Sequence, residues 1–187
     1  VADSGVNAGT IAVTVDGTAV STVTKTAIDG GYKCTCTSPT LKDGSHTISV
    51  KTSDNDGNAA AAKTATFTVD TVPPTLQITA PSNDLITNKK TVTVSGKTDD
   101  VSSKPVTVTV NGATVTVGTD GTFTKDVTLA EGANTITIVA KDKAGKTTTV
   151  TRKVTVDTSA PVIKSITLTP NPVDCGKTFI IAVEITD

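Results

Sequence analysis

The sequence predicts an all-β protein built from tandem β-sandwiches, one complete and one split between the two ends of the chain. Thr and Val are abundant among its 187 residues, and both favour strands because a branched Cβ suits a pleated surface. Segments of alternating polar and apolar residues follow one another at sandwich spacing, with Gly, Asp and Asn between them. Several blocks of sequence recur, and no helical periodicity competes with the strands.

The recurring blocks define a module that repeats after 87 or 88 residues. One pair of blocks, nearer the start of each copy, lies 95 residues apart instead. The first copy therefore carries about seven additional residues between its VDG and GSH blocks. The recurring pairs are VDTVPPTLQIT (69–79) with VDTSAPVIKSIT (156–167), GSHTISVKTSDNDGN (44–58) with GANTITIVAKDKAGK (132–146), and VTVDG (13–17) with VTVNG (108–112).

Residues 71–157 contain one complete module with seven predicted strands. Asn111-Gly112 predicts a two-residue hairpin turn with φ > 0 at both positions, and PSNDLITNKK (81–90) is expected to be a loop. Pro73, Pro74 and Pro161 lie between modules, where a fixed φ should stiffen the links. The predicted strands are TLQITA (75–80), TVTVSG (91–96), PVTVTV (105–110), ATVTVG (113–118), TFTKDVTL (122–129), NTITIVAK (134–141) and TTTVTRKVTV (147–156).

The two ends of the chain resemble the two halves of a second module. Residues 1–70 lack the first two strands of the complete module, and residues 158–187 contain only those two strands. When FIIAVEITD (179–187) is placed before the chain's start, the joined sequence aligns with the complete module from TVTVSGKTDD (91–100) onwards. We therefore predict that 158–187 completes residues 1–70 of a neighbouring unit. One face of this assembly strand would carry Phe179, Ile181, Val183 and Ile185, and the other Ile180, Ala182 and Glu184.

Two arrangements would produce such a completion. In a covalent array, residue 187 is bonded to the next residue 1, whereas in donor-strand addition separate chains lend their last strands to the next open sandwich. Both give head-to-tail self-association, which builds a filament if the rotation does not close. The alternative is that the chain is a piece of a longer protein whose ends carry no structural meaning.

The sequence resembles the bacterial immunoglobulin-like domains that occur in tandem on cell-surface, secreted and phage structural proteins. The residues that carry the resemblance are the VDT-x-x-P links, the turns SDNDGN (53–58) and KDKAGK (141–146), and the TITI run before the second turn. The resemblance covers the whole chain and implies tandem immunoglobulin-like sandwiches outside the cell or on a virion. It implies little about function, because such domains serve as spacers, adhesins and carbohydrate-binding accessories.

Three cysteines raise the possibility of a disulfide between units. Cys34 and Cys36 are two residues apart in YKCTCTS, so they point to the same face of a strand and are poorly placed to bond each other. In an immunoglobulin-like sheet the second strand runs antiparallel to the fifth, which places Cys175 nearer Cys36. We predict a Cys36–Cys175 disulfide across the unit boundary; the alternative is three free thiols.

One turn offers a possible metal site. In SDNDGN, Asp54, Asp56 and Asn58 present oxygen ligands at alternate positions, as Ca²⁺ prefers, although no EF-hand pattern is present and a plain turn explains the same residues. The matching turn KDKAGK is not expected to bind metal. The TDD segment (98–100) and the link acids Asp70 and Asp157 could add ligands at junctions, although turn chemistry also accounts for them.

Composition argues against several classes of function. His46 is the only histidine, and the two glutamates lie in different modules, so we expect no enzyme. Net charge is −1 and aromatic content is 2%, which argues against nucleic-acid binding. No apolar segment is long enough to span a bilayer. We predict an extracellular rod or filament; the alternative is an adhesin or carbohydrate-binding spacer of a larger surface protein, for which Tyr32 is a weak glycan platform.

Overall fold

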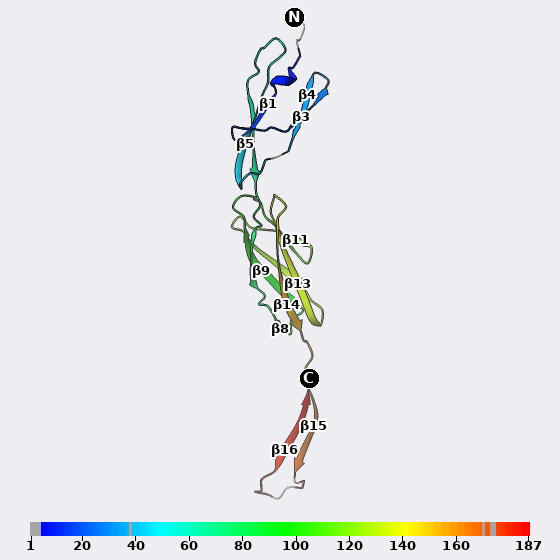
Figure 1. Ribbon diagram of the computed structural model, residues 1–187. Coiled ribbons are helices and arrows are strands. Elements are labelled where there is room, and N and C mark those ends of the chain that lie inside the picture. Colours follow the sequence, from blue (N-terminus) through cyan, green and yellow to red (C-terminus); the bar gives the residue numbers. More distant parts are fainter. Residues whose placement is uncertain (1–4, 38, 170, 173–174) are drawn as a thin grey trace. The chain divides into compact units, whose positions relative to one another are not determined.

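The computed structural model describes residues 5–37, 39–169, 171–172 and 175–187, and apart from the 3-10 helix η1 (Ala8–Thr10) its regular elements are strands. This confirms the all-β prediction (Figure 1). Over the described residues, no helix has the length and apolar character needed to cross a membrane. The chain divides into two compact units, the first containing residues up to Thr75 with Thr98–Thr107 and Ala140–Thr148, and the second Leu76–Lys97, Val108–Val139 and Thr149–Asp187.

The first module contains one four-stranded sheet and a separate hairpin. The sheet has the order β2-β1-β5-β6, and β3 pairs with β4 in a two-stranded sheet. The β1–β2 turn is a tight one in which Asp16 and Gly17 both have positive φ. The strands are β1 (Ala12–Val15), β2 (Thr18–Ala19), β3 (Val23–Ile28), β4 (Gly31–Cys36), β5 (Gly44–Lys51) and β6 (Lys63–Val69).

The second module contains two sheets, of five and three strands. The larger has the order β11-β10-β13-β14-β8, and the smaller has the order β12-β9-β7. β10 pairs antiparallel with β11, and β12 pairs antiparallel with β9, whereas β8 pairs parallel with β14. The strands are β7 (Thr75–Ala80), β8 (Leu85–Thr87), β9 (Thr91–Asp99), β10 (Thr107–Val110), β11 (Ala113–Val115), β12 (Thr122–Thr128), β13 (Gly132–Lys141) and β14 (Thr147–Val156).

The buried apolar core is concentrated in the second module. Its buried side chains come from both sheets, so each sheet contributes its inward-facing residues to one layer. In the first module, only Val13 and Val15 are buried among the apolar residues that the structure describes. The core residues of the second module are Val92, Val94, Val108, Val110, Val115, Phe123, Leu129, Ile136, Ile138, Ala140, Val154 and Val156.

The seven strands predicted for residues 71–157 are all present, and Asn111 and Gly112 have the positive φ values predicted for their turn. One further strand of this module was not predicted. The segment 81–90, expected to be a loop, contains β8, which joins the sheet through three residues paired parallel with β14. In the first copy, the β3–β4 hairpin lies between the VDG and GSH blocks, and Ile28 pairs with Gly31 next to its turn.

The last described strands form a hairpin, β15 (Val162–Thr169) with β16 (Ile180–Thr186), shown at the red end of the chain in Figure 1. They pair antiparallel from Val162↔Thr186 to Thr169↔Ile180. β7 and β9, their counterparts in the repeat, are likewise neighbours in one sheet. The side chains of this hairpin are exposed almost throughout.

Candidate functional site

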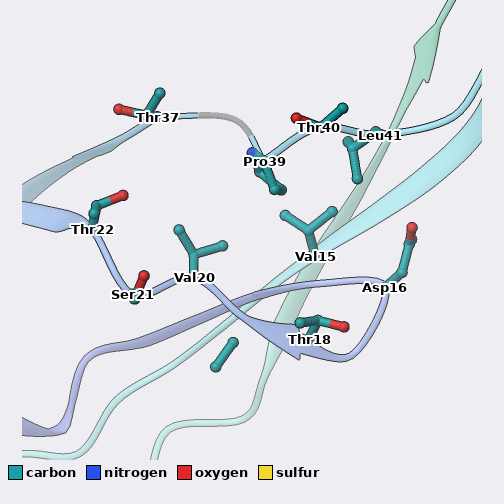
Figure 2. A pocket seen from close by; sticks show the side chains of 11 residues that line it. Val15, Asp16, Thr18, Val20, Ser21, Thr22, Thr37, Pro39, Thr40 and Leu41 are labelled. Carbon is teal, nitrogen blue, oxygen red and sulfur yellow. The ribbon is translucent and has the colours of Figure 1, made fainter.

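A cavity of about 590 Å³ opens into the first module beside β1 and β2 (Figure 2). Val15, Val20 and Leu41 line it together with small polar residues such as Thr18 and Thr37. Native cores leave few voids larger than a water molecule, which occupies about 30 Å³. The cavity is therefore large enough to accommodate several apolar side chains.

The repeat gives a counterpart in the second module for three residues that line this cavity. The aligned VTVDG and VTVNG blocks place Val15 and Val20 at the positions of Val110 and Val115, and the TLKDG and TLAEG blocks place Leu41 at Leu129. All three counterparts are buried in the second module. There, β9 adds the inward-facing residues Val92 and Val94 to the same core. The first module, as described, has no counterpart of β9.

Strand β4 is the place where that counterpart would pair. In the second module, β12 pairs antiparallel with β9 over seven residues, from Thr122↔Lys97 to Thr128↔Thr91. β4 occupies the same position in the repeat, but its partner among the described strands is β3. The predicted assembly residues lie on or beside β16, and all are exposed: Phe179, Ile180, Ile181, Val183 and Ile185.

The predicted cysteine pair is not formed within the chain. Cys34 and Cys36 lie on β4 and Cys175 lies in the turn before β16, and all three are free and exposed. Cys36 pairs across the hairpin with Val23. The Cys36–Cys175 disulfide between units therefore stays a prediction.

The links that follow the two modules are held by the same hydrogen bonds. In the first link, Thr71 donates from its backbone N and its Oγ1 to Asp43, at 3.0 and 2.9 Å. In the second link, Thr158 donates from the same two atoms to Glu131, at 2.8 and 2.7 Å. These bonds lower the pKa of Glu131, the backbone bond from Thr158 having the largest effect.

The Asp residue that begins each link makes a turn of its own. Asp70 Oδ1 accepts from Val72 N at 3.1 Å, and Asp157 Oδ1 accepts from Ser159 N at 3.0 Å. The repeated VDT sequence therefore encodes a repeated local structure at both positions.

Three buried carboxylates meet beside the first link. Asp70, Asp100 and Asp142 each offer a carboxylate oxygen, and these oxygens lie within 4.8 Å of one another. The three residues are 8%, 6% and 5% exposed, which is rare for an acidic side chain. Asp100 and Asp142 come from the segments 98–107 and 140–148, which belong to the same compact unit as Asp70.

Backbone donors satisfy only part of these carboxylates. Asp100 Oδ1 accepts from Ser102 N and Ser103 N at 2.8 and 2.7 Å, and Asp142 Oδ1 accepts from Lys146 N at 2.8 Å. The Oδ2 atoms of Asp70 and Asp142 are buried and have no hydrogen-bond partner. Among the described residues, no Lys, Arg or His lies within ion-pair distance of the three acids.

Sequence reasoning found part of this cluster. Asp70 and the TDD segment were recognised as possible junction ligands, but the KDKAGK turn was expected to contribute none, and Asp142 in that turn belongs to the cluster. The signal in the sequence was the alternation of β13, in which every second residue near its end is buried. Asp142 directly follows this strand and continues the buried positions.

The other predicted metal turn is internally hydrogen-bonded. Asp54 Oδ1 accepts from the backbone N of Asp56 and of Asn58, and Asp54 Oδ2 accepts from the Asn58 amide at 2.7 Å. These are the bonds of a plain turn. Calcium binding by Asp54, Asp56 and Asn58 stays a prediction.

Comparison with known proteins places both modules in families. Residues 3–71 match the bacterial Ig-like domain family, and residues 74–158 match glucodextranase, domain B. Bacillopeptidase F of Bacillus subtilis (strain 168) is 32% identical over 143 residues, which is 76% of this chain and 10% of that protein. The chain thus spans about a tenth of the length of this curated relative.

The comparison with solved structures includes two that contain several modules. The fibronectin(III)-like modules of Clostridium thermocellum CbhA have a TM-score of 0.46 and 17% identity, covering 79% of this chain and 77% of that one. A tetra-tandem repeat from the extending region of a large adhesion protein has a TM-score of 0.40 and 21% identity, covering 98% and 56%. The chain thus carries two immunoglobulin-like domains in tandem, the first matching the bacterial Ig-like domain family and the second matching glucodextranase, domain B.

Proposed function

We propose that this chain is a non-catalytic spacer within a larger secreted or cell-surface protein. Domains of the bacterial immunoglobulin-like type are typical of such proteins, and the curated relative is a peptidase of which this chain matches about a tenth. The short links support the spacer role, because each is tied by hydrogen bonds to the module before it. Hydrogen-bonded, proline-containing links limit the freedom of successive modules.

We further propose that the spacer extends by completing one module at each junction. The observation that carries this proposal is the contrast between Leu41, which lines a cavity, and Leu129, which is buried at the same position of the repeat. The hairpin β15–β16 has the two strands that the first module lacks, and its apolar side chains are exposed. Both an exposed apolar strand and a strand edge open to a further partner favour association.

The alignment specifies how the hairpin would fit. Aligning FIIAVEITD with TVTVSGKTDD at their last residues, Asp187 with Asp100, puts Phe179 and Ile181 at the positions of Val92 and Val94. Those two valines are buried in the second module. We infer that Phe179 and Ile181 fill the open core while β16 pairs antiparallel with β4. The hairpin comes from the preceding repeat of one chain or from a neighbouring copy, and the contact is the same in either case.

Calorimetry on a chain in which two copies are joined end to end tests this proposal. The joined chain should gain an unfolding transition at a higher temperature than any transition assigned to the first module of the single chain, because its junction closes the core. Ile181→Asp in the first copy should abolish the gain, since it would bury an unpaired charge. Ala182→Thr, on the opposite face of β16, is the matched control and should retain the gain. Identical transitions in single and joined chains would refute completion.

An adhesive role is the second candidate, and the same variants separate it from the first. Tyr32 on β4 is exposed and could stack on a sugar ring. A glycan array that gave hits lost on Tyr32→Ala would favour adhesion. Because β4 is also the proposed pairing strand, those hits should weaken in the joined chain if completion covers it.

A further inference from the structure

We propose that Asp70, Asp100 and Asp142 bind a divalent cation, with Ca²⁺ as the preferred ion. This inference concerns a site within one compact unit and is independent of whether the first module is completed. It rests on three observations: the close approach of three buried carboxylates, the unpartnered Oδ2 atoms of two of them, and the lack of a protein cation beside any of them in the described part of the chain.

The cluster brings three negative charges together. Three ionised carboxylates within 4.8 Å repel one another strongly where water is excluded. Proteins normally pair a buried charge or let it coordinate a metal. In the part of the chain that the structure describes, Lys104 lies four residues after Asp100, and it pairs with Asp99 at 2.8 Å, not with the cluster. A bound cation would supply the missing positive charge.

Two of the carboxylates have an oxygen without a hydrogen-bond donor. Asp70 and Asp142 each direct one oxygen to a backbone N–H of their own turn, which leaves Oδ2 buried without a donor. Leaving a buried acceptor unsatisfied costs free energy, and this cost is greater for a charged group. A single shared proton could bridge these two oxygens, but it would leave two of the three negative charges in the cluster. A divalent cation can contact both oxygens and offsets two of the three charges, so the cluster favours a cation over a shared proton.

Hydrogen bonds hold the loops that carry Asp100 and Asp142. Asp100 Oδ1 is held by the backbone of Ser102 and Ser103, so the carboxylate is fixed by its own loop. That loop is tied to the Asp142 turn, because Lys143 N donates to Ser103 O at 3.1 Å and Ala144 N donates to Ser103 Oγ at 2.8 Å. The two loops thus hold their acids together without help from the acids themselves, which is how a prearranged ligand site is built.

The type of ligand atom indicates which ion the cluster would bind. The donor set is made of carboxylate oxygens alone, which suits Ca²⁺ or Mg²⁺ and not Zn²⁺, since zinc favours His and Cys ligands. His46 contacts Asp16 and Lys42 instead, and the three cysteines are exposed elsewhere. Ca²⁺ accepts six to eight oxygens in irregular geometry, whereas Mg²⁺ retains several waters in a strict octahedron. Three buried acids from separate segments therefore favour Ca²⁺.

The location gives the site a structural consequence. Asp70 begins the first link, while Asp100 and Asp142 belong to loops that follow β9 and β13. The link is already tied to β14 and β9, because Thr148 Oγ1 donates to Pro74 O at 2.5 Å and Thr75 Oγ1 donates to Asp99 O at 2.9 Å. A cation shared by the three acids would fasten residues 70–75 to both loops.

Calcium titration of the full chain tests the site. After removal of metal with EDTA, isothermal titration with CaCl₂ should give saturable binding, and Ca²⁺ should raise the midpoint of thermal unfolding by several degrees. MgCl₂ should give a smaller shift. Asp142→Asn and Asp100→Asn should abolish both the binding and the shift, because each removes one charged ligand while keeping the Oδ1 acceptor for its backbone donors.

Two matched controls and one additional measurement distinguish a metal site from a purely structural cluster. Asp126→Asn, at an exposed position bonded to Thr93, and Asp54→Asn, in the other candidate turn, should both retain the calcium shift. In EDTA, Asp142→Asn should be at least as stable as the unmodified chain, because one repulsive charge is gone. The proposal is overturned if Ca²⁺ leaves the unfolding midpoint unchanged, or if Asp54→Asn abolishes the shift while Asp142→Asn does not.

Discussion

His46 Nδ1 lies 2.6 Å from Asp16 Oδ2, joining the start of β5 to the β1–β2 turn of the first module. The other ring nitrogen, Nε2, lies 2.7 Å from the carbonyl oxygen of Lys42. Asp16 also accepts from Thr47 N at 2.9 Å. Both ring nitrogens thus face acceptors, an arrangement that favours the doubly protonated imidazolium.

This arrangement predicts a raised pKa for His46. The hydrogen bond to Asp16 is the largest cause, and the Lys42 carbonyl adds to it, so the folded-state pKa lies above 6.5. The stability that His46 contributes should be complete below about pH 6.5 and should be lost as the pH rises through the folded pKa. Proton NMR can follow this titration directly, because the chain has one histidine.

Asp16 provides the control for that titration. The pKa of Asp16 is lowered, chiefly by the hydrogen bond with the His46 side chain. The stability that Asp16 contributes should therefore be complete above its ordinary pKa of 3.8 and should be lost as the pH falls through its lower pKa in the folded state. Asp16→Asn should return the His46 midpoint towards 6.5 while preserving the turn, since Asn occupies the same place in the second module. A midpoint at or below 6.5 in the unmodified chain would contradict the prediction.

A second prediction concerns Gly96 in the middle of β9. It lies opposite Phe123 of β12, and a Cβ at this position would approach Gln77 O to 2.5 Å and Phe123 Cζ to 2.8 Å. Gly96→Ala should lower the free energy of unfolding by about 1–3 kcal/mol, as overpacking of a core does. Chemical denaturation followed by circular dichroism measures this change.

Gly31 is the matched control for Gly96. It also lies on a strand, β4, but a Cβ added to it would meet no atom within 4 Å, and its φ is not positive. Gly31→Ala should therefore be neutral or slightly stabilising, because alanine restricts the unfolded chain more than glycine does. Equal losses at the two positions would show that the contact with Phe123 is not the cause.

A third prediction concerns the links. Asp43→Ala and Glu131→Ala each remove the acceptor for both donors of the following Thr, so each link should become more accessible to a protease. Cleavage by a broad-specificity protease should rise several-fold at 70–74 for Asp43→Ala and at 157–161 for Glu131→Ala. Asp29→Ala, at an exposed position in the β3–β4 turn, should leave both rates unchanged. Unchanged cleavage in the first two variants would show that these hydrogen bonds do not restrict the links.

A fourth prediction follows from Cys36 and Cys175. If β16 pairs with β4 as β9 pairs with β12, oxidation should crosslink successive copies through these two residues, and a non-reducing gel should display a ladder. Cys36→Ser and Cys175→Ser should each abolish the ladder, whereas Cys34→Ser should retain it. Monomer alone under oxidising conditions would contradict the disulfide.

The strands and turns were predictable because their signals are local. Asn111-Gly112 requires a hairpin turn by its backbone preferences alone, and the alternation in β9 and β13 reports which residues face the core. β8 was missed because three residues carry no periodicity and its partner β14 lies far along the chain. Pairing of that kind depends on tertiary structure.

The acidic cluster was only partly predictable for the same reason. Asp70 and Asp100 were conspicuous in sequence as acids at a junction, but Asp142 is one of many acids in turns. Its burial depends on the loop containing Ser103, which is more than thirty residues away in sequence. The open core was visible in sequence only as two missing strands, while its position beside Val15 and Leu41 required the fold.

Hydrogen exchange on two copies joined end to end tests the central claim most directly. The account predicts that amides of residues 180–186 in the first copy and 31–36 in the second become strongly protected at the junction, relative to the same amides in the single chain. Ile181→Asp in the first copy should remove that protection, and Ala182→Thr should not. Amides at the junction that exchange as rapidly as those of the single chain would contradict the completion of one module by the next.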